Sequence, residues 1–130
     1  MLLIDTYLDK SPIEGIGVFT KVKLFKGTIT WRFNPHLDRI LYEHDTYSIA
    51  EHLFLQKYAY YDLQLKHWIL CVDNDRFTNH SDTPNTGPNE KGEVVTLRDI
   101  EVGEELTIDY WEIDDYAGKK FIKWAYESES

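Results

Sequence analysis

A short polar segment, residues 76 to 85, constrains the fold of this 130-residue chain more than any other part of the sequence. It reads Arg-Phe-Thr-Asn-His-Ser-Asp-Thr-Pro-Asn, so amide, imidazole and hydroxyl groups lie within a few positions of each other. Pro84 disfavours helical backbone before it, which predicts an extended or turned segment. Two interpretations are open: a loop whose side chains satisfy its own backbone, or a functional site.

A second segment, residues 103 to 110, favours the functional interpretation. The two segments read Arg-Phe-x-Asn-His-Ser-x-x-Pro-Asn and Gly-Glu-Glu-Leu-Thr-x-Asp-Tyr, and together they resemble the two signature motifs of SET-domain protein lysine methyltransferases. Residues 15 to 19, Gly-Ile-Gly-Val-Phe, are similar to the Gly-x-Gly segment near the start of that family's domain. The resemblance runs from about Ser11 to Tyr110, with the three motifs in the family's order.

The resemblance implies a mainly β fold of the SET type, similar to a β-clip. This fold has several small sheets, few short helices and a pseudoknot, in which the C-terminal segment passes through a loop near residues 76 to 85. Strand patterning by itself predicts only a mostly β chain, because threaded chains are rare. We expect a single SET domain over residues 1–130, with a core at about 11–110 and a segment, 111–130, that closes the site.

Runs of β-branched and aromatic residues predict strands over residues 2–7, 28–33, 93–98 and 106–110, and a hairpin made of residues 58–61 and 68–72. A helix is predicted from about Asp45 or Thr46, because apolar residues recur there at spacings of three and four: Ile49, Ala50, Leu53 and Phe54. A second short helix is predicted between Tyr116 and Tyr126, where it either covers the site or packs on the core.

Methyl transfer from a sulfonium to a lysine amine is an in-line displacement that depends on alignment, and the amine must be neutral. By resemblance, Tyr110 is the catalytic residue, with its oxygen near the reacting methyl group. Strand alternation places Tyr110 and Ile108 on one face. Glu105 and Asp109 would face the other way, as structural or surface groups.

The resemblance also implies S-adenosylmethionine as the cofactor. The Asn79 amide is expected to contact its amino-acid end, and the His80 backbone its adenine. The predicted cofactor-binding residues are Gly15, Ile16, Gly17, Arg76, Phe77, Asn79, His80 and Tyr110. Residues predicted to line the substrate channel are Ile108, Tyr58, Tyr60, Tyr61, Phe121 and Trp124, although the tyrosines are equally compatible with core packing.

Many relatives bind zinc through a cysteine-rich segment after the tyrosine motif. The only cysteine here is Cys71, in an apolar run, and Asp82 stands where many relatives have cysteine. We therefore expect a zinc-independent protein without a metal site. The alternative for His80, a zinc ligand or the base of a nucleophile, lacks a second ligand at a suitable spacing and a serine motif.

The chain carries 14 Lys and Arg against 23 Asp and Glu, a formal charge of −9. This charge disfavours direct binding to nucleic acid and favours a basic, lysine-containing protein substrate, such as a histone-like or ribosomal protein, although a merely soluble surface is the alternative. No signal peptide or long apolar run is evident, so we expect no membrane partner and a cytoplasmic location, with a nuclear one left open. A homodimer is compatible with the sequence.

The sequence thus predicts an S-adenosylmethionine-dependent protein lysine N-methyltransferase. The alternative is a catalytically inactive SET-fold module that binds a basic partner through its acidic surface.

Overall fold

The computed structural model describes residues 1–42 and 47–113. Their short strands form four small sheets with few helices, which confirms the mainly β prediction. None of the helices in these two ranges is long and apolar enough to cross a membrane. In chain order the elements are β1 (Thr6–Lys10), β2 (Ile16–Thr20), β3 (Ile29–Trp31), β4 (Arg39–Leu41), α1 (Ile49–Tyr58), β5 (Tyr60–Asp62), β6 (His67–Leu70), the 3-10 helix η1 (Asn74–Phe77), β7 (Asn79–His80), β8 (Thr86–Pro88), β9 (Val94–Thr96), β10 (Thr107–Ile108) and α2 (Tyr110–Ile113).

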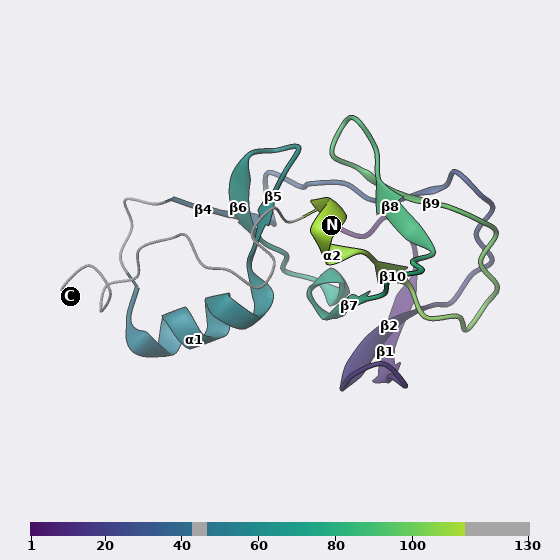
Figure 1. Cartoon of the computed structure of the whole chain (residues 1–130), viewed down its shortest axis with the longest axis horizontal. Helices are drawn as coiled ribbons and strands as arrows, with labels where there is room; N and C mark the ends of the chain where they lie inside the picture. Colours follow the sequence, from purple (N-terminus) through teal and green to yellow (C-terminus); the bar gives the residue numbers. More distant parts are fainter. Residues whose placement is uncertain (43–46, 114–130) are drawn as a thin grey trace.

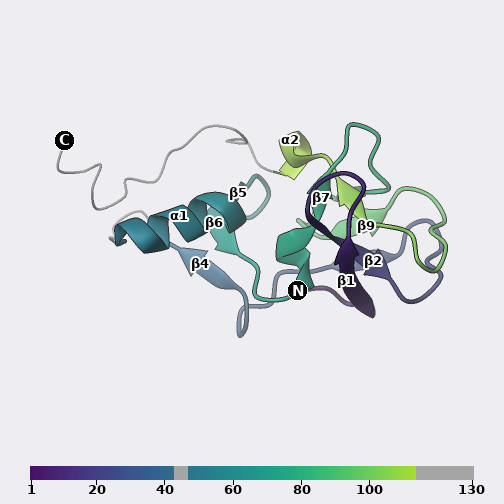
Figure 2. The same ribbon diagram turned by 90° about the horizontal axis from the view of Figure 1, so that it is seen from below.

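The elements form two groups along the long axis of the molecule (Figure 1). One group holds α1 and the antiparallel sheet β4-β6-β5, and the other holds the hairpin β1-β2 and the sheet β3-β9-β8. Figure 2 shows the same division from below. Three core clusters stabilise them, and the cluster of Trp31, Ile69 and Cys71 joins β3 of one group to β6 of the other. The remaining clusters are Leu41, Leu55 and Trp68, and Val18, Leu24, Ile100 and Leu106.

Helix α1 begins later than predicted. Ser48 is its N-cap: the Ser48 hydroxyl accepts a hydrogen bond from the Glu51 backbone N–H at 3.2 Å, and the Glu51 carboxylate accepts one from the Ser48 N–H at 2.9 Å. This reciprocal capping box starts the helix after Ser48 and not after the predicted caps, Asp45 or Thr46. Residue 45 and residue 46 lie outside the described residues.

The apolar face expected for α1 is not its buried face. Ile49 and Leu53 are 63% and 61% exposed, whereas His52 and Leu55 are buried. Leu55 packs against Trp68 of β6, so the sheet fixes the orientation of the helix through a different side. Tertiary contacts have overridden the apolar periodicity.

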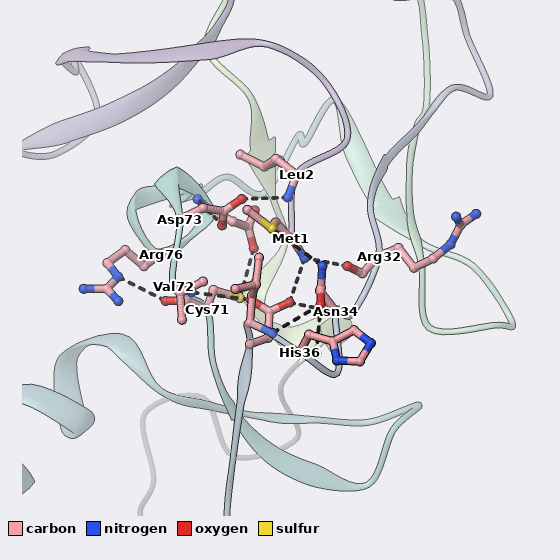
Figure 3. Close-up of polar contacts among 12 residues, drawn as sticks. Met1, Leu2, Arg32, Asn34, His36, Cys71, Val72, Asp73 and Arg76 are labelled. Carbon is pink, nitrogen blue, oxygen red and sulfur yellow. Dashed lines mark hydrogen bonds and ion pairs between the residues drawn. The ribbon is translucent and has the colours of Figure 1, made fainter.

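The first strand is also displaced from its predicted range of residues 2–7. Leu2 makes only an isolated bridge to Trp31, and β1 starts at Thr6. The Leu2 backbone N–H donates to the Asp73 carboxylate at 2.8 Å, and the Met1 amino group donates to the buried Asp38 carboxylate at 2.8 Å (Figure 3). These bonds hold the first residues against two later segments instead of in a sheet.

The hairpin predicted for residues 58–72 is confirmed by the antiparallel pair β5 and β6, and the strand predicted for residues 93–98 is confirmed by β9. Strand β10 is shorter than the predicted 106–110, because the chain turns at Asp109 and Tyr110 begins α2. The predicted helix between Tyr116 and Tyr126 lies outside the described residues.

The two motif segments lie side by side in the fold. Strand β7 pairs with β10 in parallel, with Asn79 opposite Thr107 and His80 opposite Ile108. The Asn85 side chain accepts a hydrogen bond from the Thr107 N–H at 2.8 Å and donates to the Glu105 carbonyl at 2.8 Å. These bonds place residues 105–109 against residues 79–85, while the threading of the pseudoknot remains a prediction.

Candidate active site

Glu105 connects the glycine segment to the first motif. Its carboxylate accepts hydrogen bonds from the Ser11 hydroxyl at 2.8 and 2.9 Å and from the Asn79 side-chain amide at 2.9 Å. A Cβ atom added to Gly17 would lie 2.2 Å from the Glu105 Oε2 atom. Glycine at position 17 is therefore what allows this carboxylate to reach its partners, and Glu105 has the structural role expected from the sequence.

The loop before β2 is fixed through its carbonyl groups. The Asn79 amide also donates to the Glu14 carbonyl at 3.1 Å and to the Ile16 carbonyl at 3.3 Å. Gly15 has a φ of +47° and open space where a side chain would stand, and Ile16 is exposed. The loop is thus held in position with its backbone accessible at Gly15, which fits main-chain contacts to a cofactor.

The variant Gly17→Ala tests this arrangement. The added methyl group is expected to push the Glu105 carboxylate away from Ser11 and Asn79, which costs about 1 to 3 kcal/mol in the free energy of unfolding. Urea denaturation measures this loss. The matched control is Gly87→Ala, where the new Cβ would meet its neighbours at ordinary distances of 3.5 to 3.6 Å. Equal stability of the two variants would contradict the role assigned to Gly17.

Two residues of the first motif position Tyr110. The Tyr110 hydroxyl donates to the Thr78 carbonyl at 2.5 Å, and the Tyr110 backbone N–H donates to Nδ1 of His80 at 3.0 Å. Since Nδ1 accepts a hydrogen bond, the imidazole proton is on Nε2, which donates to Asp82 at 2.8 Å. The His80 side chain therefore has a structural role, and its tautomer is set by the backbone of Tyr110.

The Tyr110 hydroxyl lies near two negatively charged carboxylates. Burial raises the pKa of Tyr110 to about 12, and the carboxylates of Glu14 and Asp75 add to the rise. The hydroxyl consequently stays protonated at neutral pH, as a hydrogen-bond donor. The same two carboxylates stabilise positive charge nearby, so this position suits a sulfonium or an ammonium group.

A cavity of about 290 Å³ lies beside Tyr110. Of the residues predicted for the substrate channel, Ile108, Tyr58 and Tyr60 line it, as does Tyr110. Tyr61 does not, because alternation along β5 turns it to the opposite face. There it packs edge-on against Trp68 at 5.8 Å and belongs to the core. Phe121 and Trp124 lie outside the described residues.

Arg76 and Phe77 hold the aromatic wall of this cavity. The Arg76 Nε atom donates to the Cys71 carbonyl at 3.0 Å, and its guanidinium lies over the rings of Phe54 and Tyr58 at 5.5 and 5.7 Å. Phe77 meets Tyr58 edge-on at 5.7 Å. Both residues therefore support the wall, and direct contacts from them to a cofactor remain predictions.

Sequence reasoning missed the polar residues of the cavity. Thr78, Asp62 and Asp75 line it, together with Trp31, whose indole nitrogen has no hydrogen-bond partner among residues 1–42 and 47–113. Asp75 stands in an Asp-Asn-Asp run that is typical of a solvated turn, so only its position directly before Arg76 could have drawn attention to it. In the described part of the chain, no three His, Cys, Asp or Glu side chains cluster to hold a metal ion.

The arrangement defines a small β domain that brings two polar motifs together around a tyrosine and a cavity. The family model of the SET domain matches residues 15–111, and the chain belongs to this family. No protein with curated annotation matches the chain significantly.

The fold is shared with many solved structures, of which two are described. A humanized mutant of the Chaetomium thermophilum Polycomb Repressive Complex 2, bound to the inhibitor GSK126, aligns with a TM-score of 0.59 and 17% identity over 82% of this chain. The chain spans 15% of the length of that protein. A candidate histone methyltransferase of Plasmodium falciparum aligns with a TM-score of 0.53 and 20% identity, covering 84% of this chain and 95% of the other.

Proposed function

We propose that this protein is a lysine N-methyltransferase that uses S-adenosylmethionine and acts on a basic protein. The observation that carries the proposal is the Tyr110 hydroxyl, held on the Thr78 carbonyl at the wall of a cavity with aromatic lining. Membership of the SET domain family supports it, as does the likeness in fold to a Plasmodium falciparum protein that is named as a candidate histone methyltransferase.

The residues present fit a cationic methyl donor. When bound, S-adenosylmethionine would supply a methyl group on a positively charged sulfur. Glu14 and Asp75 stabilise such a charge near Tyr110, and the open backbone at Gly15 offers main-chain contacts beside Asn79. Asn79 would hold the cofactor through its amide oxygen, since its amide nitrogen is already bonded to Glu105 and the glycine loop.

The cavity suits the end of a lysine side chain. Its aromatic walls remove the amine from water, and desolvation beside a cation lowers the pKa of that amine. The Tyr110 hydroxyl oxygen and the Thr78 carbonyl oxygen are hydrogen-bonded to each other, and together these two oxygens fix the direction of the nitrogen lone pair. The net charge of −9 favours a basic protein over an acidic one as the bearer of the lysine.

Two measurements test the proposal together. Calorimetry with S-adenosylmethionine measures cofactor binding, and radiolabelled methyl transfer to a panel of basic proteins, followed by mass-spectrometric mapping, identifies the modified lysine. A folded protein that gives no binding heat and transfers no label would instead favour the alternative function, a SET-fold module that holds a basic partner.

Ile108 leads to a prediction about the product. Its side chain is 5% exposed and lines the cavity near Tyr110, and it has no hydroxyl with which to hold the amine or a water molecule. We expect the enzyme to proceed to di- and trimethyl-lysine. Mass spectrometry of a peptide product under excess cofactor measures this distribution.

The variant Ile108→Tyr is the companion to that measurement, since it adds both bulk and a hydroxyl. It should shift the product toward monomethyl-lysine. Exclusive monomethylation by the wild-type protein at complete turnover would contradict the prediction, and it would indicate that Tyr58 or Tyr60 fills the space instead.

A further inference from the structure

Asp75 is a carboxylate in the wall of the cavity, and its negative charge near Tyr110 is not the only property that suits it to the reaction. It belongs to η1 and is joined to Tyr110 through a single residue, Thr78. The Thr78 hydroxyl donates to Asp75 Oδ1 at 3.1 Å, while the Thr78 carbonyl accepts from the Tyr110 hydroxyl at 2.5 Å. Asp75 and Tyr110 thus line the same cavity, and each is hydrogen-bonded to a different oxygen atom of Thr78.

The charge of Asp75 is poorly compensated inside the protein. Among the described residues, its second oxygen accepts a hydrogen bond only from the weak thiol donor of Cys71, at 3.4 Å. Within the described ranges, no Lys, Arg, His or amino group lies within ion-pair distance of it. Burial, assisted by the nearby Asp73, raises the pKa of the Asp75 carboxyl to about 6. A carboxylate in this state binds a proton or a cation readily near neutral pH.

The two cationic side chains that line the cavity have partners of their own. The Arg76 guanidinium is bonded to the Cys71 carbonyl and lies over two rings, and the Lys57 ammonium lies over the Tyr58 ring at 5.3 Å. The remaining titratable groups that line the cavity with Asp75 are Tyr58, Tyr60, Asp62, Cys71, Tyr110 and Glu112. The Met1 amino group, which does not line the cavity, lowers the pKa of Asp75, but its effect is the smallest of those that shift this pKa.

We propose that Asp75 accepts the proton that the substrate's lysine ammonium loses before methyl transfer. This inference rests on the proposed function. An Nζ–H bond of the ammonium breaks, the proton passes to the Asp75 carboxylate, and the electron pair left on Nζ forms the new N–C bond to the methyl carbon. The C–S bond of the sulfonium breaks with its electron pair going to sulfur. Asp75 then releases its proton to water.

The other candidates for this step are less suitable. Tyr110 stays protonated, with a pKa of about 12, and so cannot accept the proton near neutral pH. Asp62 already accepts three hydrogen bonds, from the Tyr60 hydroxyl at 3.2 Å and from the backbone N–H groups of Gln64 and Leu65 at 3.0 and 2.9 Å. These bonds give Asp62 the role of closing the turn between β5 and β6.

The pH dependence of kcat/KM tests the proposal. If Asp75 takes the proton, the ammonium form of lysine is the substrate, and kcat/KM should be level between about pH 6.5 and 9 in the wild-type protein. In Asp75→Asn only the free amine can react, so kcat/KM should be lower at neutral pH and rise about tenfold per pH unit over the same range. The matched control, Asp62→Asn, should keep the level profile whatever its stability.

Cofactor binding, measured by calorimetry on each variant, separates this inference from the proposed function. Asp75→Ser serves as a second variant that retains a hydrogen-bond partner for Thr78, and it should give the same sloping profile. Identical profiles for wild type and both Asp75 variants would overturn the role of Asp75 and leave the methyltransferase proposal standing. A sloping profile in Asp62→Asn would also overturn it, because the effect would then belong to the cavity's charge in general. A wild-type protein without methyl transfer would remove both proposals.

Discussion

Replacing Tyr110 with phenylalanine is expected to lower the turnover of methyl transfer at least tenfold, or about 1.4 kcal/mol of transition-state stabilisation. Within residues 1–42 and 47–113 the hydroxyl makes one hydrogen bond, to the Thr78 carbonyl, and it is the group that pairs with this carbonyl to align the amine. The backbone bond from Tyr110 to His80 does not depend on the hydroxyl. The variant should therefore keep its fold and its affinity for the cofactor.

Steady-state kinetics with a labelled methyl donor measures this effect, since kcat should fall more than KM changes. Tyr61→Phe is the matched control. This variant also removes a tyrosine hydroxyl, but Tyr61 lies in the β5-β6 hairpin, where it packs on Trp68 outside the cavity. Activity of Tyr110→Phe within a factor of two of the wild-type value would exclude Tyr110 from the catalytic step.

The meeting of the two motifs followed from the sequence because both contain residues with specific partners. Asn85 uses its side chain to bond the backbone on both sides of Leu106, and Asn79 bonds the carboxylate of Glu105. Residues of both motifs were expected to contact one cofactor, so recognition of the motifs was sufficient to predict that they would adjoin. The bonds themselves, and the need for glycine at position 17, became visible only in three dimensions.

The setting of Tyr110 could not be predicted in this way. Alternation of polar and apolar residues suggested a strand through residue 110, but the Tyr110 N–H bonds to the imidazole of His80 instead of to a strand. This contact comes from a residue thirty positions earlier in the chain. Local periodicity carries no information about such a partner, and the same reason explains why the buried side of α1 is the side of Leu55.

The role of Asp75 could not be predicted from the sequence, for a different reason. An acidic residue in a polar run is usually solvated, and no pattern of neighbours distinguishes one that is buried against a thiol and a hydroxyl. Its importance follows from the combination of a cavity, two uncharged partners and a raised pKa. Buried carboxylates without a cation reduce stability, so they persist where function requires them.

This cost gives a prediction for the stability of Asp75→Asn. The pKa of Asp75 is raised from an ordinary value of 3.8 to about 6 in the folded protein, so the folded state binds the proton more tightly than the unfolded state does. The resulting contribution to stability is fully present below about pH 3.8 and is lost as the pH rises through about 6. Above that pH the carboxylate destabilises the fold, and asparagine should remove the penalty.

We therefore expect Asp75→Asn to raise the free energy of unfolding at about pH 7.5 by roughly 1 to 3 kcal/mol, the lower figure allowing for weaker hydrogen bonds to Cys71 and Thr78. At about pH 5 the gain should be smaller by roughly 1 kcal/mol, because part of the wild-type carboxyl is then protonated. Urea denaturation of both proteins at the two pH values measures the difference, in which the pH-independent loss of hydrogen bonds cancels. A gain that is the same at both pH values, or a variant less stable at the higher pH, would show that Asp75 is not a strained buried acid.

A stabilised variant with a sloping pH profile of kcat/KM would mean that the protein keeps this carboxylate for the reaction at the expense of the stability of its fold.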